Sequence, residues 1–292
     1  MPGTRVHVLA VCGHESGHGS ALRHLAGPDT TVVTGGRELY RALAARPARQ
    51  DTAVVPMTLG RDRELVADAA RAVRALPPEA HREGAPAGAT AGALVVADPF
   101  GGPEHLTGWL RAAAATVPAA AALLLTAPGG DPYQDAELYR VAHLVRRHGR
   151  HRLVECALVG GDPEPAEGVR RCVLLGARQV AVLPASFLPA ALPDAPAGAA
   201  VLDAGPLLGP AALAAVLSAR AAAALRRLRE SGEDGLAAAL GAAEGHGPAH
   251  SHGPAHGHGP GGHHHDHPHP HPQLHLQQHV HPSPLTAARS HP

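Results

Sequence analysis

The sequence predicts an α/β protein with two tandem parallel-sheet domains, followed by a histidine-rich tail. Three observations support this prediction. Short apolar runs alternate with amphipathic stretches, the two halves of the chain share motifs in the same order, and the composition changes abruptly after residue 240. Fully apolar strands that alternate with helices are typical of parallel sheets covered on both faces.

We expect eight strands, each an apolar run that ends in turn residues. They are Val6–Cys12, Thr31–Thr34, Thr52–Val55, Leu94–Ala97, Leu123–Thr126, Leu153–Val159, Gln179–Leu183 and Val201–Leu202. The expected helices are Arg37–Ala45, Arg61–Leu76, Glu104–Ala115, Asp135–Arg147, Ala166–Leu175 and Pro210–Glu230. Because ligands of such sheets bind beyond the carboxyl ends of the strands, the residues after each strand are the first candidates for a site.

Two pairs of matching motifs indicate an internal duplication. Residues 98–106 align without a gap with residues 205–213, and both segments lead into an Ala/Leu-rich helix that contains an arginine. Residues 54–59 and 182–187 form the second pair, an apolar strand that runs into proline. We therefore predict domains over 1–118 and 119–240 and a tail over 241–292. Residues 77–92 would be a surface loop inserted in the first copy.

Charge and composition exclude several classes of function. The 25 basic side chains, all arginine, balance 25 acidic ones, which gives no support to a nucleic-acid or anionic-membrane partner. The absence of lysine excludes a Schiff-base lysine and a P-loop lysine. Three widely spaced cysteines form neither a disulfide framework nor a metal knuckle. With no secretory signal and no membrane-length apolar run, we expect a cytoplasmic protein.

The tail holds 15 of the 24 histidines, from His246 onward. Its Gly, Pro and His composition cannot bury enough apolar area to offset chain entropy, so we expect disorder. Imidazoles suit Co, Ni, Cu and Zn, which predicts several weak metal sites on this segment. The densest group is His263, His264, His265, His267, His269 and His271. The alternatives are a solubilising low-complexity tail and an added purification tag, although a tag would be an uninterrupted histidine run.

The loop directly after the first strand, Gly13–Ser20, is the second chemical signal. It carries His14, Glu15 and His18 within five residues. Two imidazoles and a carboxylate could hold a divalent cation with open positions or supply a general base. The alternative is a loop whose histidines cap the next helix or face solvent.

In these motifs the chain resembles the sirohydrochlorin chelatases of cobalamin biosynthesis, the ATP-independent class II metal chelatases, in their long two-domain form. In that family the first strand ends in Gly-His-Gly-Ser, and residues 13–16 stand in that place. Residues 54–62 and 102–105 resemble the family's later strand and turn, and residues 123–142 and 154–184 resemble the second half of the long members. The resemblance covers about residues 5–228 and implies two tandem chelatase-like, flavodoxin/Rossmann-like domains.

The resemblance implies insertion of a divalent metal into sirohydrochlorin or a related tetrapyrrole. The metal is a substrate, with Co²⁺ favoured and Ni²⁺ or Fe²⁺ as alternatives, and no cofactor is required. His14 would be the principal ligand or base, assisted by Glu15 and His18. The family's second histidine is absent, and Asp62 or Glu64 would replace it as a metal ligand. The expected substrate-binding residues are Ser16, Arg61, Arg63 and His105, with the arginines pairing with substrate carboxylates.

Two other interpretations stay open at this point. The first is a non-catalytic cobalt or nickel storage or delivery protein with a degenerate chelatase-like body. The lack of the second histidine favours it. In the second half of the chain the position of the first histidine is Ala127 or Pro128, so no imidazole carries over there either. The second is an unrelated α/β enzyme with an incidental tail.

Overall fold

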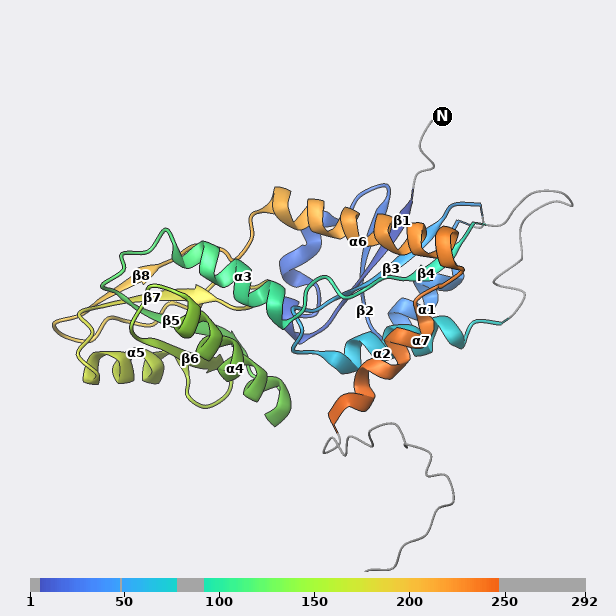
Figure 1. Cartoon of the computed structure of the whole chain (residues 1–292). Coiled ribbons are helices and arrows are strands. Elements are labelled where there is room, and N and C mark those ends of the chain that lie inside the picture. Colours follow the sequence, from blue (N-terminus) through green and yellow to red (C-terminus); the bar gives the residue numbers. More distant parts are fainter. Residues whose placement is uncertain (1–5, 48, 78–91, 247–292) are drawn as a thin grey trace, which may run out of the picture. The chain divides into compact units, whose positions relative to one another are not determined.

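Two four-stranded parallel sheets, with helices on both faces, form the computed structural model (Figure 1). It describes residues 6–47, 49–77 and 92–246. The first sheet has the order β2-β1-β3-β4 and the second β6-β5-β7-β8. The strands are β1 (His7–Cys12), β2 (Thr30–Thr34), β3 (Thr52–Met57), β4 (Leu94–Val96), β5 (Ala122–Pro128), β6 (Val154–Val159), β7 (Gln179–Pro184) and β8 (Ala200–Asp203). The predicted fold class is confirmed.

Both sheets repeat one strand order, second-first-third-fourth, which is the beginning of the flavodoxin-like order. Their registers also correspond, since Pro56 of β3 lies beside Val11 and Pro184 of β7 lies beside Thr126. Val11 of the first sheet therefore corresponds to Thr126 of the second. Three residues further along each chain segment, His14 corresponds to Gly129. The predicted position, Ala127 or Pro128, was short by one or two residues. The second half still carries no imidazole at this place in its sequence.

Alternate residues of each buried strand face different helix layers, as the pleat requires. Leu9 and Val11 of β1 pack with α1 (Arg37–Ala44) and α2 (Arg63–Arg74), whereas Ala10 and Cys12 belong to the core on the opposite face. In the second sheet, one face packs against α5 (Pro165–Leu174) and the other against α4 (Pro132–His148). This two-sided burial explains why the strands are apolar throughout.

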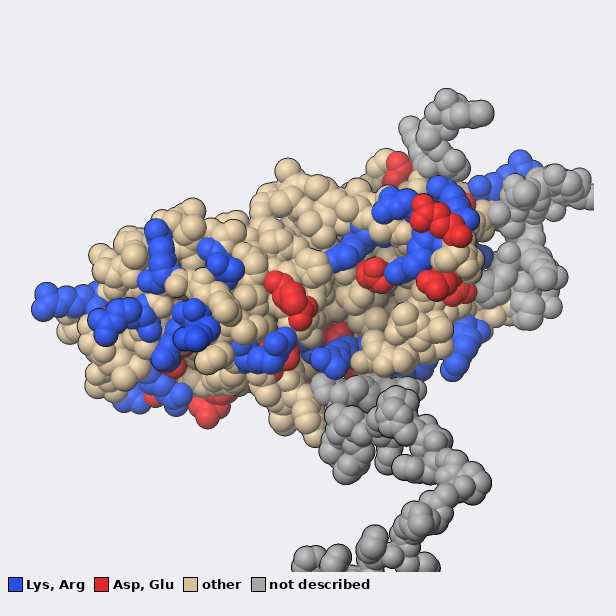
Figure 2. Space-filling model, viewed as in Figure 1, with Lys and Arg blue, Asp and Glu red and all other residues tan. Residues whose placement is uncertain are grey.

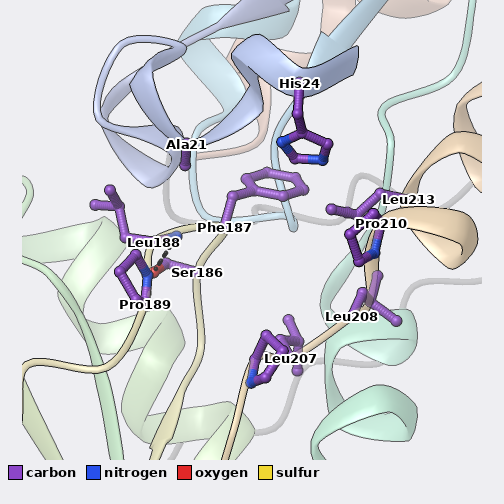
Figure 3. Close-up of a pocket in the computed structure, with 11 residues that line it drawn as sticks. Ala21, His24, Ser186, Phe187, Leu188, Pro189, Leu207, Leu208, Pro210 and Leu213 are labelled. Atoms are coloured by element: carbon purple, nitrogen blue, oxygen red, sulfur yellow. Dashed lines mark hydrogen bonds between the residues drawn. The ribbon is translucent and has the colours of Figure 1, made fainter.

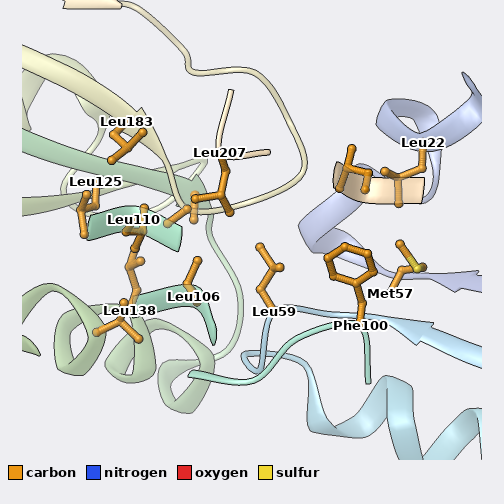
Figure 4. Packing of buried hydrophobic residues seen from close by; sticks show 14 of the residues in the cluster. Leu22, Met57, Leu59, Phe100, Leu106, Leu110, Leu125, Leu138, Leu183 and Leu207 are labelled. Carbon is orange, nitrogen blue, oxygen red and sulfur yellow. The ribbon is translucent and has the colours of Figure 1, made fainter. Parts of the chain in front are cut away.

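The helices that follow the fourth strands are exchanged between the sheets. Helix α3 (Pro103–Ala114) follows β4 but packs against α4 and β7, and α6 (Pro210–Ser231) follows β8 but packs on β3 and β4 (Figure 1). One hydrophobic core therefore runs through both halves, as Figure 4 shows for the labelled leucines and Phe100. The domain limits 1–118 and 119–240 stay a prediction.

Helix starts follow the local sequence closely. Proline occupies the first turn of α3, α4, α5 and α6, where its missing N–H costs nothing. Asp62 caps α2 by accepting a hydrogen bond from the Leu65 N–H. These caps lie at the carboxyl ends of the strands and direct the helix starts toward the candidate site.

The end of the described chain lies against the first sheet. Helix α7 (Leu236–Leu240) and the short 3₁₀ helix η4 (Gly241–His246) both contact α2, so residues 241–246 depart from the predicted tail. The rest of the tail, with its six histidines between positions 263 and 271, lies outside the described residues, as does most of the predicted loop 77–92. Within the described ranges no helix is both long and apolar enough to cross a membrane.

Candidate functional site

The loop after β1 is a compact turn built on Ser16. Its hydroxyl donates to the Gly13 carbonyl over 2.9 Å and accepts from the Gly19 N–H over 3.1 Å. Gly17, His18 and Gly19 then adopt φ angles of 57°, 51° and 87°, in the left-handed region that favours glycine. The glycines of this motif are therefore needed for the turn itself, and the turn presents His14 at the carboxyl end of β1.

The loop after β3 is joined to this turn by Glu15. The side chain of Glu15 is fully buried, and its Oε2 accepts hydrogen bonds from the Thr58 hydroxyl and, over 2.9 Å, from the Leu59 N–H. The Thr58 oxygen in turn accepts from the N–H groups of Gly60 and Asp62, each over 3.1 Å. Glu15 and Thr58 thus hold the two strand ends in one arrangement.

Burial raises the pKa of Glu15, although the charge of Arg61 and the hydrogen bonds from Thr58 and Leu59 oppose the shift. Its Oε1 has no hydrogen-bond partner among the described residues. The carboxyl is enclosed by protein, so its position suits a supporting role for the loop better than direct contact with a ligand.

His14 and Asp62 form the central pair of the site. His14 Nδ1 lies 3.1 Å from Asp62 Oδ2, and the two side chains are 19% and 12% exposed. Asp62 Oδ1 accepts from the Leu65 N–H over 2.9 Å. Burial alone would raise the pKa of Asp62, but the hydrogen bonds from His14 and Leu65 and the charges of His14 and Arg61 hold it below its usual value.

An ionised Asp62 requires a proton on His14 Nδ1, which leaves the lone pair of the neutral ring on Nε2. That Nε2 atom is buried and has no partner among the described residues. Pairing of one imidazole nitrogen with a carboxylate is the common arrangement of metal-binding histidines, whose other nitrogen takes the ion. The geometry therefore suits either a metal ligand or a general base at Nε2.

Arg61 lies away from solvent and connects the two halves of the fold. Its Nε donates to the Gln134 carbonyl and its Nη2 to the Pro128 carbonyl, both over 3.0 Å. Nη2 also pairs with Asp135 Oδ1 over 3.1 Å. The sequence analysis had proposed Arg61 as a substrate-binding residue. Its side chain is fully buried in these contacts, so it is not placed to bind substrate carboxylates.

The other predicted residues are dispersed. His18 and Glu64 are exposed, and Glu64 pairs with Arg71 rather than approaching His14. Ser16 is buried inside its turn, and Arg63 is half-buried at the start of α2. His105 is exposed on α3, where its Nε2 lies 3.2 Å from Arg220 Nη2. Within the described ranges, no three His, Cys, Asp or Glu side chains come together as a metal-binding group.

An apolar pocket adjoins the His14 loop (Figure 3). Its volume is about 240 Å³, and Phe187, Leu207 and Leu213 line it together with His24 of the segment after β1. The Phe187 N–H donates to the Glu15 carbonyl over 3.0 Å, which ties the pocket wall to the His14 loop. His14 itself does not line this pocket.

Sequence reasoning missed Thr58 and the hydrogen bonds by which Asp62 joins His14 to the start of α2. The signal for Asp62 was present, because an aspartate just before an amphipathic run is a typical helix cap and its carboxylate must then face the strand ends. Thr58 carries no comparable signal, since its importance comes from Glu15, which is 43 residues away in the chain.

No model of a known protein family matches the chain. Over 65 residues it is 35% identical to sirohydrochlorin cobaltochelatase of Priestia megaterium. The match covers 22% of this chain and 21% of the relative, so it spans about one fifth of the curated protein. The resemblance to the sirohydrochlorin chelatases that the motifs indicate is confirmed by this relative.

Two solved structures are also similar to the chain. SirB from Bacillus subtilis with Fe³⁺ aligns with a TM-score of 0.44 and 13% identity, covering 78% of this chain and 97% of that one. The sirohydrochlorin chelatase SirB from Bacillus subtilis subspecies spizizenii in complex with cobalt aligns with a TM-score of 0.43 and 13% identity, covering 77% and 97%.

Proposed function

We propose that this protein inserts a divalent metal into sirohydrochlorin or a related tetrapyrrole. The observation that supports this most directly concerns the two ring nitrogens of His14. Nδ1 lies 3.1 Å from Asp62 Oδ2, whereas Nε2 is buried and has no hydrogen-bond partner among the described residues. The sequence likeness to a sirohydrochlorin cobaltochelatase supports this choice of substrate class. Co²⁺ is the favoured metal, with Ni²⁺ and Fe²⁺ as alternatives, and the cytoplasm is the proposed location.

In the proposed reaction the divalent ion replaces two pyrrole N–H protons of the macrocycle, and both protons leave to solvent. His14 Nε2 supplies a lone pair at the strand end, either for the incoming ion or for one of the protons. Asp62 fixes the orientation of the ring and stabilises it when it carries a second proton. Glu15 and Thr58 keep the two loops in register.

The apolar pocket beside this loop is the proposed seat for part of the macrocycle. Its volume of about 240 Å³ is below the range of roughly 300–1,000 Å³ typical of ligand sites, so it would take an edge of the tetrapyrrole and leave the rest outside. Phe187 and the neighbouring leucines offer an apolar surface, and His24 adds a second imidazole at the rim.

A metal-insertion assay with Co²⁺, Ni²⁺ and Fe²⁺ in parallel tests the proposal. We expect His14→Ala to lower the rate by about 100-fold or more, the scale on which a general base or metal ligand contributes. Glu64→Ala is the matched control, because Glu64 lies on the adjacent helix start and is exposed. Equal rates for wild type and His14→Ala would remove this site from the mechanism.

A non-catalytic cobalt or nickel carrier is the second candidate. It is favoured by Gly129 at the position that corresponds to His14, and by the lack of a three-residue metal-binding group within the described ranges. An absorbance titration with sirohydrochlorin separates the two. A metal-dependent spectral change supports insertion, whereas metal binding without tetrapyrrole binding supports the carrier.

A further inference from the structure

A second cavity lies at the opposite edge of the second sheet, where α3 and α4 end. Its volume is about 360 Å³, and Arg111, His148, Arg150 and His151 line it together with small and apolar residues that include Val145. Among the residues that the structure describes, no carboxylate lines it. The volume falls within the range of small-molecule sites.

Two of the basic side chains are fixed by the end of α3. Arg150 Nη2 donates to the carbonyls of Ala115 and Val117 over 2.7 and 2.5 Å. His151 is buried, with its ring nitrogens 3.0 Å from the Ala121 carbonyl and 3.1 Å from the Ala114 carbonyl. These hydrogen bonds preorganise the wall of the cavity, so less conformational entropy is lost when a ligand binds.

The positive charge around the cavity is poorly compensated. Residues 146–152 hold four arginines and two histidines and no acidic residue. In the part of the chain that the structure describes, neither these arginines nor Arg111 form an ion pair, whereas Arg140, Arg170 and Arg171 on the nearby helices all pair with glutamates. Figure 2 shows arginines gathered over the region of α3, α4 and α5 with few acidic groups between them.

This cavity is separate from the His14 site. Its neighbour Ala121 precedes β5, whereas Pro128 at the other end of β5 contacts Arg61. At about 3.3 Å per residue the strand separates the two places by about 20 Å. The cavity is therefore not part of the His14 site.

We propose that this cavity binds a small organic or inorganic polyanion with at least two carboxylate or phosphate groups. Guanidinium groups bind both by charge-assisted, often bidentate hydrogen bonds. The anion would contact Arg111, His148 and the guanidinium nitrogens of Arg150 other than Nη2. The described lining offers no Phe, Tyr or Trp, which distinguishes the cavity from a nucleic-acid groove with its stacking surfaces. The proposal does not depend on the proposed metal insertion.

Calorimetric titration of the full chain in metal-free, low-salt buffer at pH 8 tests this site, with pyrophosphate and citrate as separate probes. This pH is above the unperturbed histidine pKa of about 6.5, so binding reports chiefly on the arginines. We expect one probe to bind with a dissociation constant below about 1 mM, and added salt to weaken it. The tighter of the two identifies phosphate or carboxylate as the preferred group.

Arg111→Gln should weaken binding about tenfold or more, because it removes one charge-assisted contact. Arg226→Gln on α6, exposed and outside the cavity, is the matched control and should change affinity less than about twofold. Arg111 is exposed, so its variant is expected to keep the wild-type circular dichroism and melting temperature. Three results would overturn the proposal: no binding of either probe at about 10 mM, equal weakening by both variants, or tighter binding of a single-stranded oligonucleotide than of both probes.

Discussion

At the scale of single residues, the candidate site depends on how Asp62 divides its two oxygens. One oxygen caps α2 through Leu65, and the other holds His14. The same carboxylate thus fixes a helix and an imidazole together, which sets the direction of His14 Nε2. This arrangement supports the proposal that Asp62 positions His14, whereas the resemblance to the chelatases had implied a metal ligand at this residue.

Substitution of Asp62 separates these two tasks. Asn caps helices about as well as Asp, so Asp62→Asn should keep the cap and lose only the stabilisation that comes from the charge, while lowering the metal-insertion rate by about 10- to 100-fold. Asp62→Ala should lower the rate and also cost ~0.5–2 kcal/mol of stability through the lost cap. Insertion rates and urea unfolding of both variants check this, above about pH 5, where Asp62 with its lowered pKa stays ionised.

A wild-type insertion rate in Asp62→Asn would contradict the positioning role. Rate losses that merely parallel the stability losses in both variants would instead indicate that Asp62 serves the fold alone. Below its unfolded pKa of about 4, wild-type stability should fall as acid protonates Asp62, because a lowered folded pKa contributes stability only while the group is charged.

The three cysteines illustrate the opposite case, in which a reactive side chain is buried for packing. Burial raises the pKa of Cys12 to about 11 and those of Cys156 and Cys172 to about 12. A thiol is nucleophilic and metal-binding as the thiolate, so none of them should react with a thiol reagent at pH 8 in the folded protein. All three should react in denaturant. Rapid labelling of Cys12 in the native state would show that the end of β1 opens.

At the scale of elements, the approach of the β1 loop to the start of α2 requires a glycine at position 13. A Cβ atom there would lie 2.6 Å from Asp62 Oδ2 and 3.3 Å from Leu65 Cδ2. Either the Asp62 side chain or the helix start must shift if a side chain is added, and in both cases the His14–Asp62 hydrogen bond would be disturbed.

Gly13→Ala should therefore cost about 1–3 kcal/mol of stability, the usual range for overpacking, and should lower metal insertion as well. Gly108→Ala is the matched control, since a Cβ on Gly108 of α3 would meet no atom of another described residue within 4 Å. It should be neutral or stabilising by up to ~1 kcal/mol, because alanine favours the helix. Urea unfolding of the two variants gives the comparison, and equal stabilities would contradict the packing argument.

The secondary structure was largely predictable from the sequence, because each strand is a short apolar run and most helices begin at a proline or a capping residue. The exchange of α3 and α6 between the sheets was not, since periodicity indicates which face of a helix is buried but not which sheet receives it. Within the site, His14 and Asp62 were both identified as candidates. Their separate roles, and the support from Glu15 and Thr58, arise from hydrogen bonds between distant loops that sequence spacing does not encode.

At the scale of the whole molecule, the two sheets share one core and are tied together at the site by Arg61. Its three hydrogen bonds reach Pro128, Gln134 and Asp135 of the second half from the loop that also carries Asp62. The second sheet has Gly129 where the first has His14, so its contribution is to hold this loop and to supply the apolar pocket wall. The two sheets thus share one strand order, but the second carries glycine rather than an imidazole at this strand end.

The histidine-rich tail supplies the last prediction, which concerns metal supply rather than chemistry. Many imidazoles tethered to the chain raise the local metal concentration, an effect that matters when free metal is scarce and vanishes at saturation. Truncation at Gly245 should therefore reduce the number of Ni²⁺ or Co²⁺ ions bound and slow insertion at limiting metal, while leaving the rate at saturating metal unchanged. A full-length variant with every histidine from 246 onward replaced by glutamine is the control for chain length and should behave like the truncation. Loss of activity in excess metal would instead place tail histidines among the groups that act on the substrate.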